Sequence, residues 1–295
     1  MNFGHFIKNI YYLFKINLKK DHERLKSSVD LTQLHNILDS FKYEVLPNSD
    51  KPVFASDDEC FSLLINSKAS ICRFGDGELN LCEEKGIPFQ KASPQLAERL
   101  REVLSSDIPG ILIAIPELLY SDRSFYSKCA RNFTRNFGCF FIDVLNKYIH
   151  PQKTYYPAGI TLRYAGISEY DFKKYFDDFI RIWKDKDITI ICGKTVFDKI
   201  EHNIFDFAKS VEYQYAPSIN AFEEYDTVLK QALTINKNRM VIIILGPTAT
   251  VLAYDLALQG YQALDLGHIA KSYDWYIKKD SCNEQAQAND FYAPD

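Results

Sequence analysis

The sequence lacks the signatures of several common kinds of functional site. None of its 12 glycines forms the G-x-G-x-x-G turn that follows a strand and binds dinucleotides. Its seven cysteines include no C-x-x-C pair, so we expect buried, reduced thiols rather than a zinc site or a disulfide framework. The stretch CGKT at 192–195 is not a P-loop, because Ile188 occupies the position of the first required glycine. No Ser/His/Asp or Cys/His pattern indicates a catalytic nucleophile.

An excess of positive charge is also missing. The formal net charge is −4 and the isoelectric point is about 5.9, which argues against a nucleic-acid partner. No secretory signal is expected at the start, because residues 1–20 have neither a clean apolar core nor a small-residue cleavage site. The same residues are too interrupted by polar side chains to span a bilayer. These absences predict a cytoplasmic protein.

Residues 1–20 nevertheless have a distinctive pattern. They carry four lysines and no acidic residue, and their apolar side chains can share one face of a helix. Such a helix either packs on the rest of the protein or lies on an anionic membrane surface. The second interpretation predicts a peripheral protein at the inner face of the cell membrane, and the sequence leaves both open.

What the chain does contain is an ordinary globular composition. Hydrophobic residues make up 46% and charged residues 25% of its 295 positions. A chain of this length buries enough surface to fold without a disulfide or a metal staple. The turn-rich stretch at 46–52 predicts a boundary. We expect a helical extension at 1–50, a main domain at 51–280 and a C-terminal tail at 281–295.

Short apolar runs alternate with helical patterns from residue 57 onward. Strands are predicted at 69–74, 110–116, 187–193, 211–217, 240–246 and 261–267. Helices are predicted at 57–67, 93–105, 124–148 with a break near Gly138, 168–183, 196–209, 222–235 and 248–259. This alternation is typical of a mostly parallel sheet with helices on both faces, so the fold class is a Rossmann-like α/β fold.

The polar residues of interest follow the predicted strands. Asp76 and Glu78 come after the first strand, Lys194 after the third, Thr248 after the fifth and His268 after the last. In sheets of this kind, ligands bind outside the carboxyl ends of the strands. Their shared position therefore predicts a binding site at one edge of the sheet.

The stretch RFGDGE at 73–78 carries the densest charge of this edge. Two carboxylates separated by one glycine can reach a single Mg²⁺ or Mn²⁺ ion, and such ions often join carboxylates to a substrate's phosphates. Alternatively, Asp76 caps a helix and Glu78 lies in its first turn, where negative charge is favourable. Both interpretations can hold together.

Four further residues are candidates for contacts with an anion or a metal. Arg73 lies within a buried strand and needs an anionic partner, either a phosphate or a nearby acid. Lys194 and Thr248 lie at helix starts, where anions bind, but an exposed lysine and an empty helix start are also common. His268 is either a third metal ligand, a phosphate contact or a structural histidine.

Five blocks in order resemble the bacterial GT-D fold glycosyltransferases, a family long known as a domain of unknown function. They are RFGDGE (73–78), TLRY (161–164), APSINAF (216–222), LGPTATVLAYDL (245–256) and ALDLGH (263–268). The resemblance covers residues 55–278 and implies the GT-D variant of the Rossmann-like fold. It also implies that the D-x-E motif, Asp76 and Glu78, binds a divalent metal and the diphosphate of a UDP-sugar.

The resemblance assigns roles to other residues. Cationic groups that stabilise the departing UDP are expected at Arg73, Arg163, Lys194 and His268, with His268 also a candidate metal ligand. From their position alone, Asn220 and the nearby Tyr215 are candidate contacts of uridine or ribose, and Thr248 is a candidate contact of the phosphates. The family places acids two and four residues after the histidine, whereas this chain has Ala270 and Ser272. Asp274 or Asp265 would then replace the missing general base.

The expected function is the transfer of a sugar from a UDP-sugar to a glycan acceptor, on a lipid carrier or a protein, with Mn²⁺ or Mg²⁺. Two alternatives use the same residues. A metal-dependent phosphohydrolase would activate water at the carboxylates. A non-catalytic module would bind a nucleotide sugar without turnover, which the missing acids after His268 make plausible.

Overall fold

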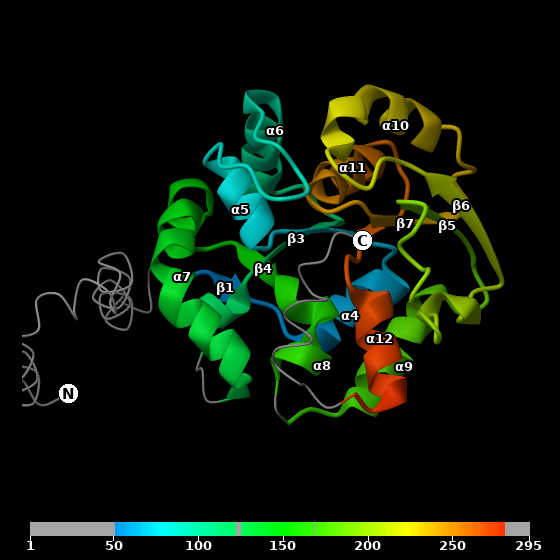
Figure 1. Cartoon of the computed structure of the whole chain (residues 1–295), viewed down its shortest axis with the longest axis horizontal. Helices are drawn as coiled ribbons and strands as arrows, with labels where there is room; N and C mark the ends of the chain where they lie inside the picture. The colour runs from blue at the N-terminus through cyan, green and yellow to red at the C-terminus, as the bar shows by residue number, and fades with distance from the viewer. Residues whose placement is uncertain (1–50, 122–124, 168, 281–295) are drawn as a thin grey trace, which may run out of the picture.

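The structure is a computed structural model that describes residues 51–121, 125–167 and 169–280. One parallel sheet lies at the centre of these residues. Its eight strands follow the order β1-β4-β3-β2-β8-β7-β5-β6, and each neighbouring pair is parallel (Figure 1). The strands are β1 (Val53–Phe54), β2 (Ser70–Arg73), β3 (Ile111–Ile115), β4 (Thr154–Pro157), β5 (Asp187–Cys192), β6 (Ser210–Tyr215), β7 (Met240–Ile244) and β8 (Ala263–Asp265). The predicted mostly parallel α/β fold is confirmed.

Two layers of helices explain why the central strands are apolar on both sides. In β3, Ile111 and Ile113 enter one core, whereas Leu112 and Ala114 enter the other, as the period of two in a strand requires. One face is covered by α5 (Asp76–Cys82), α6 (Pro94–Ser105), α7 (Lys128–Tyr148), α10 (Tyr225–Ala232) and α11 (Pro247–Leu258). The other is covered by α4 (Asp57–Asn66), α9 (Phe172–Trp183) and α12 (Ile269–Lys278) (Figure 1).

Local sequence signals fix several helix starts. The Ser56 hydroxyl accepts from the Glu59 backbone N–H while the Glu59 carboxylate accepts from the Ser56 N–H, so α4 begins with a capping box. Helix α6 begins with Ser93 as cap and Pro94 in its first turn, as predicted. Helix α9 begins later than predicted, at 172 rather than 168, because Asp171 supplies its cap.

Two predicted helical features are wrong. Residues 196–209 form turns and one short 3₁₀ helix, η5 (Ile204–Phe207), because the Asn203 side chain accepts from the Phe205 N–H and the chain must enter β6 at once. The predicted break at Gly138 is absent, since α7 runs without interruption. Gly138 is buried where the helix packs beside Leu119, so its small size serves packing rather than a kink.

Some elements were not predicted. Strand β4 has the sequence TYYP, whose proline and tyrosines do not give an apolar run, and β1 has only two residues. Helix α12 and the 3₁₀ turn η4 (Ala158–Thr161) were also missed. The turn η4 follows β4 directly, whereas three residues separate the end of β8 from α12, which begins beside His268, where the sequence indicated a site rather than a helix.

The carboxyl edge of the sheet contains a topological switch point, where neighbouring strands lead to opposite faces. Strands β2 and β7 lead into α5 and α11 on one face of the sheet, whereas β8, which lies between them, leads into α12 on the other. Chain segments that leave neighbouring strands toward opposite faces leave space above the strand ends, and open α/β sheets bind ligands there. We use the word crevice for the surroundings of this switch point at the end of β8.

The predicted extension at 1–50, the membrane contact through 1–20 and the tail at 281–295 lie outside the described residues. Within the part of the chain that the structure describes, none of the helices combines the length and apolar character needed to cross a membrane.

Candidate functional site

An ion pair between Arg73 and Asp265 forms the floor of the crevice. Arg73, the last residue of β2, donates from Nε to the Asp265 carbonyl oxygen at 2.8 Å and from Nη2 to the Asp265 carboxylate at 3.2 Å. The other guanidinium nitrogen donates to Thr161 Oγ1 at 2.8 Å and to the Ala158 carbonyl oxygen. Thr250 Oγ1 lies 3.2 Å from the same Asp265 carboxylate. The anionic partner expected for Arg73 is therefore this aspartate.

Asp76 and Glu78 lie beside that pair, in the first turn of α5. Gly75 is the residue that caps the helix, and its N–H donates to Glu78 Oε2 at 2.7 Å. The alternative in which the acids belong to a helix start is thus correct in part, with Gly75 rather than Asp76 as the cap. Within the described residues, no cation forms a salt bridge with Asp76 or Glu78. Among these residues, the backbone N–H groups at the start of α5 are what offsets the negative charge of Asp76 and Glu78.

The three carboxyl groups of the crevice carry more negative charge than Arg73 neutralises. Partial burial raises the pKa of Asp76. Partial burial and the neighbouring Asp265 carboxylate raise the pKa of Glu78 to about 7. Burial also raises the pKa of Asp265, although Arg73 opposes that effect. Carboxyl groups whose pKa values are raised in this way bind a proton readily, which is typical of functional sites.

The carboxylates fit a hard divalent cation, but only as part of its ligand set. Among residues 51–121, 125–167 and 169–280, no three His, Cys, Asp or Glu side chains gather as one metal site. His268 caps α12 and is partly buried, yet it does not complete a three-ligand cluster with Asp76 and Glu78. Mg²⁺ and Mn²⁺ commonly take one or two protein carboxylates and fill their other positions with water and phosphate oxygens.

The start of α11 forms the opposite wall of the crevice. Gly246, with φ at +52°, turns the chain from β7 into the helix, and a Cβ there would approach the Phe89 ring to 3.1 Å. Thr248 is fully buried, and its hydroxyl lies 3.4 Å from Gln90 Oε1. The first backbone N–H groups of this 12-residue helix suit an anion. The contact of Thr248 with phosphates stays a prediction.

Hydrogen bonds to the loop after β6 hold the loop between α5 and α6 beside the start of α11. The Phe89 carbonyl accepts from the Asn220 N–H at 2.8 Å, and Asn220 Oδ1 accepts from the Lys91 N–H at 2.8 Å. Gln90 Oε1 accepts from the Phe222 N–H at 3.3 Å. Asn220, at φ 54°, therefore joins the loop after β6 to the loop after α5. Its predicted contact with uridine or ribose remains a prediction.

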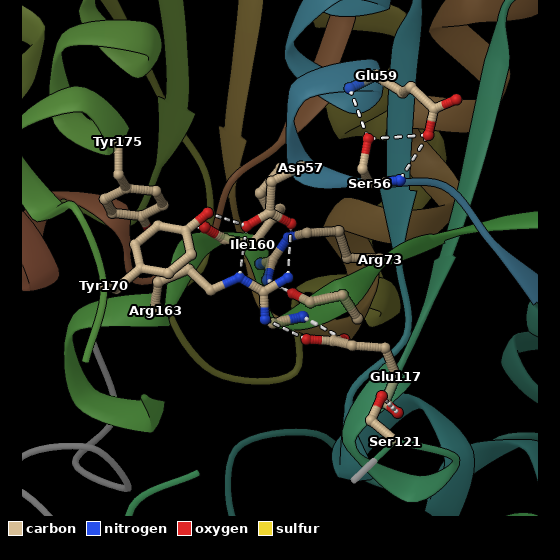
Figure 2. A network of polar contacts seen from close by, with 12 residues as sticks. Ser56, Asp57, Glu59, Arg73, Glu117, Ser121, Ile160, Arg163, Tyr170 and Tyr175 are labelled. Carbon is tan, nitrogen blue, oxygen red and sulfur yellow. Dashed lines mark hydrogen bonds and ion pairs between the residues drawn. The ribbon is translucent and has the colours of Figure 1, made fainter. Parts of the chain in front are cut away.

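Arg163 lies in a separate buried network on the other side of Arg73. Figure 2 shows its guanidinium between Asp57 and Glu117. Its Nε and Nη2 donate to the Asp57 carboxylate oxygens at 2.8 and 2.7 Å, and Nη1 forms an ion pair with Glu117. Tyr170 also donates to Asp57. Although burial alone would lower it, Glu117 and Asp57 hold the pKa of Arg163 well above its usual value. A diphosphate would have to compete with two carboxylates for this group.

The Arg163 network and the crevice share the turn η4. The Gly159 N–H donates to Glu117 Oε2 at 3.3 Å, and the Tyr175 hydroxyl donates to the Ile160 carbonyl at 2.6 Å. Arg73 binds the two ends of the same turn, at Ala158 and Thr161. Arg163 therefore helps to hold the turn against which Arg73 is placed.

The last two predicted site residues differ in exposure. Lys194 is exposed in the turn after β5 and forms no hydrogen bond or ion pair with other described residues, so its side chain can reach a ligand. Asp274 is buried on α12, where its carboxylate accepts from the His202 N–H at 2.9 Å and pairs with Lys278 at 2.9 Å. A general-base role for Asp274 stays a prediction and would require the carboxylate to leave these partners.

The surface depressions found among the described residues lie mainly at the amino ends of the strands, at the edge of the sheet opposite the candidate site. One of about 700 Å³ is lined by the turns that precede β2, β5 and β7, including Lys68, Lys186 and Arg239. Arg239 is committed there to Thr189 Oγ1 and the Ile188 carbonyl. None of the polar clusters at the carboxyl ends reaches this edge, so we place the candidate site at the crevice.

A substitution at Gly267 tests the floor of the crevice. Its φ is +43°, and an added Cβ would lie 2.2 Å from Arg73 Nη2. We expect Gly267→Ala to displace the guanidinium and to lower the free energy of unfolding by about 1–3 kcal/mol, as measured by urea denaturation. Gly166→Ala is the matched control, because a Cβ there meets no atom within 4 Å. Equal stabilities of the two variants would contradict this geometry.

The match to a known family now has a structural context. A family model described as "Glycosyltransferase GT-D fold" matches residues 71–291, which include the whole crevice. The chain belongs to this GT-D family. The resemblance found in the sequence is thereby confirmed.

Two curated relatives are similar to the chain. A probable glycosyl transferase Gly of Streptococcus gordonii is 33% identical over 75% of this chain and 32% of its own length. Glycosyltransferase GlyD of Streptococcus pneumoniae serotype 4 is 27% identical over 74% of this chain and 27% of its own length. The chain thus spans about a third of the length of the curated relatives it matches.

Solved structures give the same result for the fold. A structure described as a new glycosyltransferase (DUF1792) from Streptococcus sanguinis aligns with a TM-score of 0.73 at 30% identity, over 78% of this chain and 86% of the other. Another, described as the highly conserved domain of unknown function 1792 with a distinct glycosyltransferase fold, aligns with a TM-score of 0.74 at 30% identity, over 83% and 86% of the chains. The GT-D type of the fold is confirmed.

Several residues of the site were not identified from the sequence. Gln90 and Phe89 lie in a loop without a motif, and only their contacts with Thr248 and Gly246 connect them to the crevice. Thr250 lies inside the quoted block LGPTATVLAYDL, so its position two residues after Thr248 was the available signal. The partners of Arg163 had no signal, because Asp57 reads as part of an acidic first turn.

Proposed function

We propose that the chain is the glycosyltransferase domain of a metal-dependent enzyme that takes a sugar from a UDP-sugar and adds it to a glycan acceptor. The observation that supports this best is the arrangement at the end of β8. Asp76 and Glu78 form no salt bridge with a cationic side chain of the described residues, and they lie near the start of α11. Excess negative charge on one wall suits Mn²⁺ or Mg²⁺, and a helix start on the other suits a diphosphate.

Each part of the crevice then has a task. Asp76 and Glu78 would hold the cation, whose positive charge offsets the charge that develops on the leaving diphosphate. The N–H groups at the start of α11, with Lys194 across the strand ends, would orient the diphosphate oxygens. Arg73 keeps Asp265 in place from below rather than meeting the diphosphate directly. His268 remains a candidate contact at the start of α12.

The reaction breaks the bond between the anomeric carbon of the sugar and the diphosphate oxygen, and forms a bond from that carbon to an acceptor hydroxyl oxygen. The bonding electron pair leaves with UDP. The hydroxyl proton passes to a site carboxylate or to water. The acceptor glycan would be carried by a lipid or a protein.

Calorimetric titration of UDP with and without Mn²⁺ tests the donor site. We expect binding to the wild-type protein to depend on Mn²⁺, and we expect Asp76→Asn/Glu78→Gln to lose that dependence because both amides are poor ligands for a hard cation. Glu98→Gln, which changes an exposed residue on α6, controls for the loss of a carboxylate away from the site. UDP binding that ignores both the metal and the double substitution would refute the proposed site.

Product analysis separates the transferase from its alternatives. UDP release that rises when an oligosaccharide acceptor is added supports the transferase. Release of inorganic phosphate from simple esters would instead indicate a phosphohydrolase. Binding of UDP-sugar without any turnover would indicate a module that only binds.

A further inference from the structure

A short turn between α5 and α6 contacts both walls of the crevice. Ile87 and Gln90 exchange backbone hydrogen bonds at 2.9 and 3.2 Å, so residues 87–90 form one closed turn, which we call the bridging turn. Its side chains reach the start of α5, which contains the proposed metal ligands, and the start of α11, where the diphosphate is proposed to bind. The two walls are therefore connected by one compact element.

The first contact of the bridging turn is with the D-x-E motif at the start of α5. A Cβ added to Gly77, the glycine between the two acids, would lie 3.2 Å from Ile87 Cδ1 and 3.8 Å from Pro247 Cγ. Pro247 is the first residue of α11. The starts of α5 and α11 therefore face each other at Gly77, and the Ile87 side chain packs beside this meeting point.

The second set of contacts is with the start of α11. A Cβ added to Gly246 would lie 3.1 Å from the Phe89 ring. Gln90 is only 3% exposed, and its Oε1 accepts from the Thr248 hydroxyl at 3.4 Å and from the Phe222 N–H at 3.3 Å. Both lone pairs of this oxygen are used in a buried position. Gln90 is thus placed to hold other residues rather than to contact a ligand itself.

A third set of contacts holds the bridging turn from the side of β6. The Phe89 carbonyl accepts from the Asn220 N–H at 2.8 Å, and Asn220 Oδ1 accepts from the Lys91 N–H at 2.8 Å. The turn is therefore bonded within itself, to α11 and to the loop after β6. Packed and fully bonded elements keep one arrangement rather than a range of them. The two helix starts that the turn contacts should then keep one separation.

We propose that the bridging turn sets the spacing between the cation at Asp76 and Glu78 and the diphosphate at the start of α11, with Gln90 as the positioning residue. This proposal rests on the proposed glycosyltransferase function. A cation that joins carboxylates to a diphosphate strengthens the binding of the diphosphate only if both sites lie at the right distance from it. The turn would therefore act on the coupling between the two ligands.

A purely structural role of Gln90 makes a different prediction. Hydrogen bonds of a buried amide stabilise a fold wherever they occur, so a structural Gln90 would lower the free energy of unfolding when it is replaced. The folded molecules would still bind Mn²⁺ and UDP as the wild type does. A positioning Gln90 also changes the coupling factor, by which we mean the ratio of the UDP affinities with and without Mn²⁺.

Calorimetric titration of UDP in Mn²⁺ and in a chelator measures the coupling factor. We expect Gln90→Met to reduce it at least about fivefold, because methionine keeps the length of the side chain but has no amide oxygen for the two bonds. Ile87→Ala changes the other end of the turn, where it removes the contact beside Gly77, and should also reduce the factor. This second variant keeps the test valid if Gln90→Met does not fold.

Gln262→Met is the matched control. The Gln262 amide donates to the Leu64 carbonyl at 2.7 Å and to the Ala69 carbonyl at 3.3 Å, before the amino end of β8. Its replacement removes two hydrogen bonds at the edge of the sheet opposite the site. We expect Gln262→Met to lower the free energy of unfolding in urea, as Gln90→Met does, but to leave the coupling factor within about twofold of the wild type.

The wild-type titration distinguishes a failure of this proposal from a failure of the donor site. Wild-type UDP binding that ignores Mn²⁺ would refute the donor site and the spacing role with it. Mn²⁺-dependent binding by the wild type, with an unchanged coupling factor in folded Gln90→Met and Ile87→Ala, would overturn the spacing role alone. So would an equal loss in Gln262→Met, because lower stability would then explain it. Urea denaturation shows that each variant is folded under the conditions of titration.

Discussion

Replacing Arg163 with methionine should lower the free energy of unfolding by about 3–5 kcal/mol, since it leaves the buried carboxylate of Glu117 and the half-buried carboxylate of Asp57 without their cation. The methionine fills much of the space of the arginine stem but removes all three bonds of the guanidinium. Urea denaturation at neutral pH measures the effect. The triple variant Arg163→Met/Asp57→Asn/Glu117→Gln should recover most of the loss, because neutral amides do not leave a buried charge.

Lys174→Met is the matched control for this prediction. Lys174 also lies between two carboxylates, Asp58 and Asp178, but it is exposed, so its removal should cost less than about 1 kcal/mol. Arg163 was expected from the family resemblance to contact the departing UDP. If that is its only role, Arg163→Met should keep its stability and lose UDP affinity, a result that would contradict the structural role argued from Figure 2.

The sheet could be predicted from the sequence because its strands are buried on both faces. The stretches at 111–115 and 240–244 are continuous apolar runs, and such runs indicate parallel strands between two helical layers. Strand β4 escaped prediction because Tyr155 faces the core through an aromatic ring, while a proline ends the strand. The false helix at 196–209 had helical spacing, but its local Asn203 bond and the short path to β6 prevented it.

The location of the site was predictable, but its internal partners were not. Parallel strands place their carboxyl ends together, so Asp76, Lys194, Thr248 and His268 had to share an edge whatever the details of the fold. An arginine in a buried strand also had to find an anion. Its partner Asp265 lies 192 residues away in the sequence, and the order of the strands alone brings the two together.

Asp265 illustrates how the environment decides a carboxylate's role. The sequence offered it as a replacement general base after the departure at Ala270 and Ser272. In the structure it is buried beneath the crevice, bonded to Arg73 and Thr250. A carboxylate with those partners holds β2 and β8 together. By contrast, no cationic side chain of the described residues forms a salt bridge with Asp76 or Glu78. We therefore expect the titration of Glu78 to make the free energy of unfolding depend on pH.

Glu78→Gln should stabilise the metal-free protein at pH 8 and have little effect near pH 4.5. In the folded wild-type protein the pKa of Glu78 is raised to about 7 by partial burial and by Asp265, whereas its ordinary value is 4.5. The folded state therefore holds a proton that the unfolded state has lost, so wild-type stability falls as pH rises through this range. A shift of this size is worth at most about 3 kcal/mol, and about 1–3 kcal/mol after screening at a partly exposed site.

Glutamine removes this cost because it does not ionise, while its amide oxygen can still accept from the Gly75 N–H. Urea denaturation in the presence of a chelator at pH 4.5 and pH 8 measures the difference between variant and wild type. Glu98→Gln on α6 controls for the loss of one exposed carboxylate. A difference that does not change with pH would show that Glu78 titrates as it does in an unfolded chain.

The same substitution should have the opposite effect on activity. If Glu78 helps to hold the cation on the leaving diphosphate, its loss removes several kcal/mol of transition-state stabilisation, on the order of a hundredfold or more in kcat/KM. A variant that is more stable at pH 8 and yet nearly inactive would mean that the fold tolerates a destabilising carboxylate because the reaction needs it. A variant that is more stable and fully active would leave Glu78 as a helix-cap acid and would remove it from the proposed metal site.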